Sequence, residues 1–157
     1  MSAIPEKVRI FLEKNQLQPL EFEPGSTPTA ETAAKRIGVP VGQIAKSMLF
    51  KGKDNVFRLI VAAGDRRINN GAVKRATGAK HRMARADETV EITGFRPGGV
   101  CPFGLENHEV EILLDSSLTE YETVYPAAGT DATGVPLSPD YLQQITGARW
   151  VSVTDSV

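Results

Sequence analysis

The stretch SMLFKGKDNVFRLIVAA, residues 47–63, decides the fold of this chain. Two runs within it, Ser47–Phe50 and Val56–Ala63, are rich in residues that favour β-strands. Gly52-Lys53-Asp54-Asn55 between them has the composition of a hairpin turn. We therefore expect the two runs to pair as neighbouring strands.

Helix and strand patterns alternate on both sides of this hairpin. Thr27-Pro28 or Thr29 can cap a helix that runs through Arg36, and Gly38 closes it. Ser138 similarly caps a last helix, which ends at Thr146. The other expected elements are a helix over 5–15, an extended segment over 17–23, helices over 69–76 and 86–93, a strand over 110–114, irregular chain over 123–136 and a strand over 150–153.

The length and composition of the chain limit its organisation. With 157 residues, of which 41% are hydrophobic, it is long enough for one buried core and too short for two ordinary domains with a linker. We expect a single mixed α/β domain of the α+β type over residues 1–157. Neither an apolar run of membrane-spanning length nor a secretory signal is present, so we expect a cytoplasmic protein without a membrane partner.

Several classes of cofactor-dependent and metal-dependent enzyme lack support in the sequence. There is no Gly-x-Gly-x-x-Gly after a strand, no Walker-type loop and no His-Glu-x-x-His helix. A single cysteine and two isolated histidines offer no metal-ligand spacing. We expect neither a cofactor nor a structural metal.

The net charge of −1 conceals an uneven distribution. Through Gly104 the chain carries 17 Lys and Arg against 10 Asp and Glu, whereas Arg149 is the only base after that point, among nine acids. The densest basic stretch, 65–85, contains a single acid and could follow a phosphate backbone or form a solvated surface. His81 lies within this stretch and could contact phosphate. No aromatic residues interleave with these bases, which disfavours binding by stacking on single strands.

The segment GGVCPFG, residues 98–104, has the composition of a loop that recognises ligands through its backbone. Glycine permits positive φ and close approach to a ligand, while Pro102 fixes φ and removes one N–H donor. Cys101 invites a thiol-nucleophile interpretation, but only His81 and His108 could serve as its base. We favour a buried, inert cysteine, and we interpret His108 as an exposed surface residue.

Lys46 stands where a helix-linked segment enters an apolar strand, a setting that would partly bury its stem and fix its ammonium group. A fixed cation can bind phosphate or stabilise a developing oxyanion. A lysine at a strand edge can equally extend its head to water. Periodicity does not choose between these two interpretations.

Several short motifs follow one another in order along nearly the whole chain. The motifs are TAETAA (29–34), QIAKSMLF (43–50), AAGDRR (62–67), TGF (93–95), GGVCPFG (98–104), LLD (113–115), AGT (128–130), LSPDYL (137–142) and TGA (146–148). The ordered set is more specific than any single motif, and it resembles the YbaK/ProX family of aminoacyl-tRNA deacylases.

This resemblance implies a fold and an activity. The family fold is a largely antiparallel, twisted sheet flanked by helices, related to the editing domain of bacterial prolyl-tRNA synthetases. Its members hydrolyse the ester of mischarged tRNA, typically tRNA(Pro) that carries cysteine, alanine or another small amino acid. The implied partners are therefore aminoacyl-tRNA, above all tRNA(Pro), and prolyl-tRNA synthetase.

The resemblance also assigns roles to particular residues. Lys46 matches the family's functional lysine, which would position the terminal nucleotide or the carbonyl group. The substrate-binding residues that it implies are Gly98, Gly99, Val100, Cys101 and Pro102, together with Gly129, Thr130 and Asp131. With this family in view, the basic stretch becomes a candidate tRNA patch of Arg66, Arg67, Lys80 and Arg82.

One departure from the family pattern concerns Cys101, where members commonly have serine. A thiol is larger than a hydroxyl and a weaker hydrogen-bond partner. An alternative function is a non-catalytic module that binds tRNA or a synthetase. The presence of both Lys46 and the intact Gly98–Gly104 loop favours the enzyme, because a tether needs neither.

Overall fold

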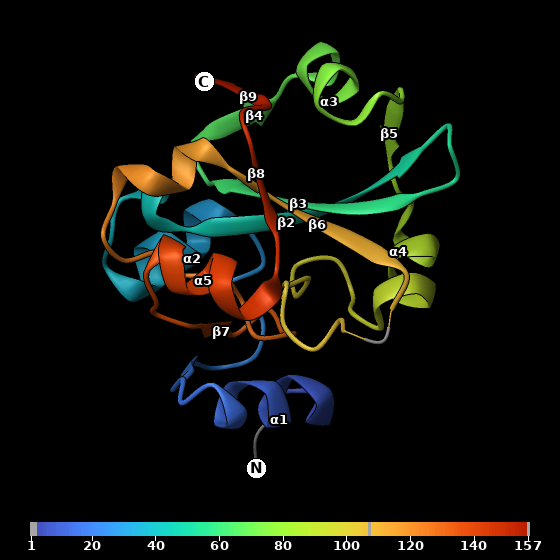
Figure 1. The fold of residues 1–157 in the computed structure, drawn as a ribbon. Coiled ribbons are helices and arrows are strands. Elements are labelled where there is room, and N and C mark those ends of the chain that lie inside the picture. The colour runs from blue at the N-terminus through green and yellow to red at the C-terminus, as the bar shows by residue number, and fades with distance from the viewer. Residues whose placement is uncertain (1–2, 107, 157) are drawn as a thin grey trace.

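A computed structural model describes residues 3–106 and 108–156 of the chain, shown in Figure 1. Its helices and strands follow the alternating order that the sequence predicted. The described α-helices are α1 (Glu6–Lys14), α2 (Ala30–Ile37), α3 (Asn70–Thr77), α4 (Ala86–Thr93) and α5 (Pro139–Thr146). The described strands are β1 (Leu20–Glu21), β2 (Ala45–Gly52), β3 (Phe57–Ala63), β4 (Arg66–Ile68), β5 (His81–Met83), β6 (Val110–Asp115), β7 (Thr133–Gly134), β8 (Arg149–Val151) and β9 (Thr154–Ser156).

The hairpin of β2 and β3 forms the centre of the molecule. The two strands pair antiparallel, from Ala45 opposite Ala63 to Lys51 opposite Phe57. At the turn, Asn55 adopts a φ of 66°, and the Gly52 N–H donates to the Val56 carbonyl oxygen over 2.9 Å. The pairing expected from residues 47–63 is confirmed.

The central sheet is mixed, with the strand order β5-β2-β3-β6-β8. β2 pairs antiparallel with β3 and β5, whereas β6 pairs parallel with β3 and β8. The described residues also form two separate antiparallel sheets of two strands each, β1-β7 and β4-β9. Over all the described strand pairs, antiparallel pairing predominates, as expected. Within the central sheet, two strand pairs are antiparallel and two are parallel. Parallel neighbours need long crossovers, and the segment between β3 and β6 supplies one.

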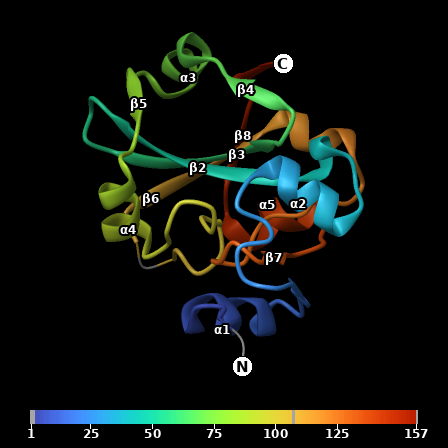
Figure 2. The same cartoon turned by 180° about the vertical axis from the view of Figure 1, so that it is seen from behind.

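Helices cover both faces of this sheet. Figures 1 and 2 show α3 on one face and α2, α4 and α5 on the other, with α1 beyond them. The larger core cluster lies on the second face and includes Leu49, Leu59 and Leu114, while the smaller cluster includes Phe50, Ile60 and Val73 of α3. Burial on both faces explains why β3 is apolar almost throughout.

The predicted helix ends agree closely with the structure. Thr29 caps α2 by accepting a hydrogen bond from the Thr32 N–H, and Gly38 ends the helix with a φ of 90°. Ser138 caps α5 through the Tyr141 N–H. The sequence did not predict β4, β5, β7 or β9, because strands of two or three residues leave too short a pattern to recognise.

Candidate active site

The candidate site lies along an open part of the edge of the central sheet. β5 pairs with β2 only at Phe50–Gly52, so within the described residues no strand ladder covers this edge from Lys46 to Met48. An uncovered edge presents backbone N–H and C=O groups to its surroundings. Here it faces the start of α2 and the loop 97–100.

A hollow of about 210 Å³, which we call the Lys46 hollow, opens at this edge. Ala45, Lys46 and Ser47 of β2 border it on one side. The start of α2 with Thr27–Ala30 forms a second wall, and Gly98 and Val100 contribute from the glycine-rich loop. The structure thus brings Lys46 and one part of the loop to the same site.

Lys46 is half-buried, and its Nζ donates a hydrogen bond to the Arg66 carbonyl oxygen over 2.9 Å. An ammonium group has three donors, so two remain for a ligand. Strand alternation places Lys46 on the opposite face of the sheet from Ser47. Because the edge is open here, residues from both faces border the hollow.

Two hydroxyl groups in the Lys46 hollow lack a hydrogen-bond partner among the described residues. Thr27 Oγ1 and Ser47 Oγ are both buried, and both residues line the hollow. An unsatisfied buried polar group costs about 1–3 kcal/mol, so such groups mark positions where a ligand or water supplies the partner. The sequence interpretation missed both residues, although Ser47 follows Lys46 directly and Thr27 was considered only as a helix cap.

Gly98 and Gly99 are required by backbone geometry and by packing, respectively. Gly98 adopts a φ of 92°, a conformation that residues with side chains rarely adopt. A Cβ atom on Gly99 would lie 2.9 Å from the backbone of Gly129 and of Thr130. Two loops distant in sequence therefore touch along their main chains, and this contact fixes one wall of the Lys46 hollow.

Thr130 and Asp131 support the site from behind and do not line the Lys46 hollow. The Asp131 carbonyl oxygen accepts a hydrogen bond from the Thr27 N–H over 2.6 Å, and its Oδ1 accepts one from the Gly25 N–H over 3.1 Å. Thr130 Oγ1 accepts a hydrogen bond from the Ala132 N–H. In this structure they hold the segment before α2, and their contact with substrate stays a prediction.

Cys101 is buried, as expected from its loop, and its side chain does not line the Lys46 hollow. It packs within the larger core cluster, where Sγ lies 3.8 Å from the Phe103 carbonyl oxygen. Burial raises the pKa of the thiol to about 12, so the thiol stays protonated at neutral pH. The structure thus agrees with a buried, inert cysteine, and substrate contact through the backbone of Cys101 stays a prediction.

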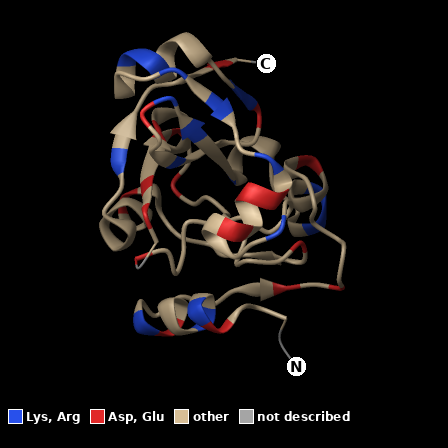
Figure 3. Cartoon of the chain, turned by 90° about the vertical axis from the view of Figure 1, so that its right-hand side faces the viewer, with Lys and Arg blue, Asp and Glu red and all other residues tan. Residues whose placement is uncertain are grey.

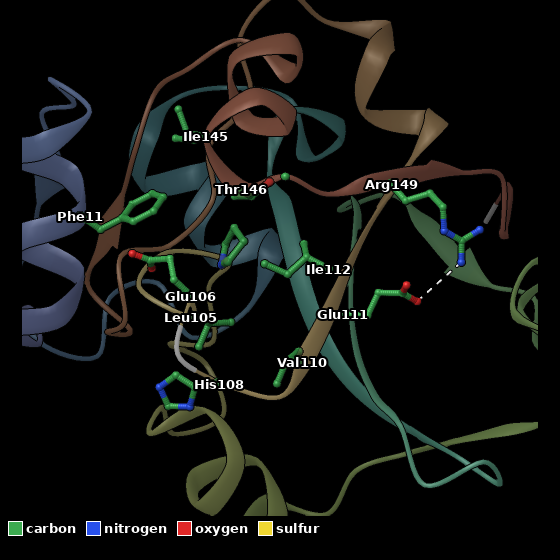
Figure 4. A pocket seen from close by; sticks show the side chains of 12 residues that line it. Phe11, Leu105, Glu106, His108, Val110, Glu111, Ile112, Ile145, Thr146 and Arg149 are labelled. Atoms are coloured by element: carbon green, nitrogen blue, oxygen red, sulfur yellow. Dashed lines mark ion pairs between the residues drawn. The ribbon is translucent and has the colours of Figure 1, made fainter.

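Pro102 faces a different hollow, which we call the His108 hollow and which Figure 4 shows from close by. It measures about 310 Å³. His108 Nδ1 donates to the Ile92 carbonyl oxygen over 2.8 Å, which leaves Nε2 to accept a hydrogen bond from Lys7 Nζ at 3.3 Å. His108 is thus half-buried and paired, not the exposed residue expected from the sequence.

The basic stretch does not form one patch. Arg66 and Arg67 lie in β4, whereas Arg82 lies in β5 opposite Lys51, and Lys80 directly precedes β5. Figure 3 shows Lys and Arg distributed over several elements, with acidic residues between them. The Arg66 guanidinium is 2.6 Å from Glu120, and that of Arg82 makes two bonds of 2.8 and 2.9 Å to Glu88.

His81, the other histidine of this stretch, is buried against Arg58. Its Nδ1 donates to the Ala79 carbonyl oxygen over 2.8 Å, and its Nε2 accepts from Arg58 Nη1, also over 2.8 Å. Both ring nitrogens are thus hydrogen-bonded to protein groups, and His81 links β5 to Arg58 of β3. The suggestion that it contacts phosphate is replaced by this structural role.

The described residues contain neither a metal-ligand cluster nor a helix that could span a membrane. No group of three or more His, Cys, Asp or Glu side chains there is arranged to hold a metal ion. None of the described helices is long and apolar enough to cross a membrane.

Comparisons with known proteins agree with this fold and identify its family. The family model of the aminoacyl-tRNA editing domain matches residues 24–145, which include Lys46 and the whole Gly98–Gly104 loop. The chain belongs to this family. Its resemblance to the YbaK/ProX proteins is therefore confirmed at the level of the family.

The relatives include separate proteins and a segment of a larger enzyme. An uncharacterised protein of Bacillus subtilis, YwhH, is 43% identical over 134 residues, which cover 85% of this chain and 84% of that protein. The proline–tRNA ligase of Bacillus licheniformis is 36% identical over 122 residues, 77% of this chain. The match covers only a fifth of the ligase, 20% of its length.

A solved structure has nearly the same extent as this chain. It is described as a proposed trans-editing enzyme for prolyl tRNA synthetase, with 34% identity, a TM-score of 0.89 and coverage of 99% of both chains. The mixed α/β fold, with a central sheet between helices, is thus shared with that protein.

Proposed function

We propose that this protein hydrolyses the ester bond of mischarged aminoacyl-tRNA in trans, and that its substrate is tRNA(Pro) carrying cysteine, alanine or a similar small amino acid. The observation that carries the proposal is the Lys46 hollow. It combines a held ammonium group, two unpartnered hydroxyls and a backbone-built wall beside an open sheet edge. Membership in the editing-domain family supports the same reaction.

The size of the Lys46 hollow favours a small amino acid. Pockets for drug-sized ligands measure about 300–1,000 Å³, whereas this hollow has about 210 Å³. An adjoining hollow of about 240 Å³, which we call the Met83 hollow, shares Ser47, Gly98 and Val100 with it. In the proposed complex, the aminoacyl group occupies the Lys46 hollow and the terminal nucleotide lies in the Met83 hollow.

The chemistry follows from the charge that develops during ester hydrolysis. Attack on the carbonyl carbon places negative charge on the carbonyl oxygen, and the free donors of Lys46 would stabilise it. The ester C–O bond then breaks, and water supplies the hydroxyl of the amino acid and the proton of the ribose oxygen. Thr27 and Ser47 would bind the amino acid through their hydroxyls.

Catalysis in this proposal uses no protein nucleophile. Both histidines are engaged in hydrogen bonds outside the Lys46 hollow, so no imidazole activates Ser47 there. The attacking atom would come from water directly, or first from a ribose hydroxyl or the thiol of a cysteinyl substrate, in which case water then hydrolyses the new ester or thioester. The substrate panel below separates the last route from the other two, because alanine carries no thiol.

A deacylation panel tests the proposal directly. Cysteinyl-, alanyl-, seryl- and prolyl-tRNA(Pro) are incubated with the protein, and the release of the amino acid is measured. We expect hydrolysis of the cysteinyl or alanyl ester with sparing of prolyl-tRNA, and a loss of rate in Thr27→Val and Ser47→Ala. Inactivity on the whole panel with intact tRNA binding would instead indicate a binding module.

A further inference from the structure

The tip of the β2-β3 hairpin carries a basic hollow outside the Lys46 site. The hollow measures about 290 Å³, and its lining includes Lys51, Lys53, Lys80 and Arg82. Lys53 and Lys80 are exposed, and Lys51 is half-buried with its Nζ 5.5 Å from the centre of the Phe57 ring. Within the described residues, none of these three lysines forms an ion pair with an acid.

The acids near the tip are already paired with arginines. Asp54 lies 3.1 Å from Arg58, and this pairing lowers the pKa of its carboxyl group. Glu88 accepts two hydrogen bonds from Arg82, which likewise lowers its pKa, to about 2. Both carboxylates are therefore ionised at neutral pH, yet each is directed at an arginine. The three lysines therefore give the tip an excess of positive charge.

The tip is also held in one shape before any ligand binds. Lys53 N–H donates to the Lys80 carbonyl oxygen over 2.9 Å, which joins the hairpin turn to the segment before β5. A Cβ atom on Gly52 would lie 2.2 Å from Asp54 Oδ1 and 2.9 Å from His81 Nε2, so the turn fits closely around these groups. A preformed set of charges binds an anion without the cost of ordering it.

The position of the tip relates it to the Lys46 hollow. Lys51 follows Lys46 by five positions along β2, a distance of about 17 Å along the strand. The Met83 hollow lies between them, and the Met83 side chain is 57% exposed there. At about 3.4 Å per stacked nucleotide, the same distance corresponds to about five nucleotides.

We propose that the hairpin tip binds backbone phosphates near the end of the acceptor stem, while the 3′ strand follows the open edge of β2 towards Lys46. The inference rests on the proposed function for the identity of the RNA. Its contacts are phosphate contacts, which add affinity without reading the sequence. Arg66 and Arg67, at the other end of β3, are not part of this surface.

Salt-dependent binding of deacylated tRNA(Pro) tests the inference without requiring hydrolysis. The variant Lys53→Gln/Lys80→Gln removes two charges from the tip, and Lys14→Gln/Lys35→Gln removes two exposed charges from α1 and α2 as a matched control. The affinity is measured from 50 to 300 mM salt. We expect the slope of log K against log salt to fall by about 1.5 in the tip variant and to stay unchanged in the control.

A second measurement separates this inference from the proposed function. The aminoacyl ester of adenosine lacks an acceptor stem, so the tip variant should cleave it at the wild-type rate, whereas Lys46→Ala should lose cleavage and keep the salt slope. Equal slopes for the tip variant and the control would overturn the inference. A reduced slope in a protein that cleaves none of the esters would support the inference and refute the proposed function.

Discussion

The Lys46 hollow and the His108 hollow lie on either side of the same loop and differ in one decisive respect. The His108 hollow is larger, about 310 against 210 Å³, and it includes a histidine, two glutamates and an arginine. Figure 4 shows Arg149 pointing towards Glu111, with which it forms an ion pair at 3.6 Å. In the Lys46 hollow, two hydroxyls lack hydrogen-bond partners among the described residues, and Lys46 donates only one hydrogen bond to them.

This difference shows that neither the volume of a hollow nor the reactive residue types in it identify an active site by themselves. A group whose hydrogen bonds are satisfied by the protein stabilises the fold, and a ligand must break those bonds to use it. Groups without partners gain their hydrogen bonds only when a ligand or water arrives. The contrast therefore supports our proposal that the reaction takes place at Lys46, and the following variants test it.

The largest expected effect comes from Lys46. Lys46→Ala removes the ammonium group from the hollow, and we expect deacylation to fall by about 100-fold or more, as when one oxyanion donor is lost. His108→Ala should change the rate by less than about 3-fold, because its ring bonds to Ile92 and Lys7 outside the site. Rates on the same aminoacyl-tRNA provide the measurement. An active Lys46→Ala with an inactive His108→Ala would reverse the comparison.

Gly99 provides a test of the wall between the two loops. Gly99→Ala places a methyl group 2.9 Å from the Gly129 and Thr130 backbone, and we expect a loss of about 1–3 kcal/mol in the free energy of unfolding. The matched control, Gly71→Ala in α3, meets only side-chain atoms at 3.3 Å and should change stability by no more than about 1 kcal/mol, in the stabilising direction. Denaturant unfolding of both variants distinguishes them; equal effects would contradict the tight wall.

Cys101 lies between Val100, which faces one hollow, and Pro102, which faces the other. Because its thiol is buried, Cys101→Ser should leave deacylation within about 3-fold of the wild type. The sign of the pH effect follows from the raised pKa of about 12. The thiol ionises in the unfolded chain above about pH 9 but not in the folded protein, so stability falls as the pH rises from 9 to 12.

Two measurements check this description of Cys101. Alkylation at pH 8 should be slow in the folded protein and fast after unfolding. The decline in the free energy of unfolding above pH 9 should be less steep in Cys101→Ser than in the wild type. Rapid alkylation of the folded protein would show that the thiol is accessible, contrary to its burial.

The smallest expected effect belongs to the ion pair of the His108 hollow. Arg149 and Glu111 are 48% and 41% exposed, and such pairs contribute about 0–1 kcal/mol. Arg149→Gln should therefore lower the free energy of unfolding by less than about 1 kcal/mol and leave deacylation unchanged. A large loss of activity in this variant would mean that the His108 hollow takes part in the reaction.

Much of the fold was predictable because its signals are local. Helix caps such as Thr29, Gly38 and Ser138 act on neighbouring peptide groups, and the β2-β3 hairpin joins adjacent segments. The parallel pairing of β6 with β3 and β8 joins segments that are far apart in the sequence. No local sequence pattern predicts such a pairing. The split of the basic stretch follows from the same cause, since β4 pairs with β9 in a separate sheet whereas β5 is an edge strand of the central sheet.

The order of elements and the family could be read from the amino-acid sequence alone, because composition and motif order are properties of the chain. The sequence also made Lys46 and the Gly98–Gly104 loop the candidates for the site. Only the tertiary structure decided which groups are free to bind. It buried Cys101, paired both histidines and, within the described residues, left the hydroxyls of Thr27 and Ser47 without hydrogen-bond partners. The physical reason is that a hydrogen bond depends on which residues folding brings together, and a sequence pattern records the groups but not their partners.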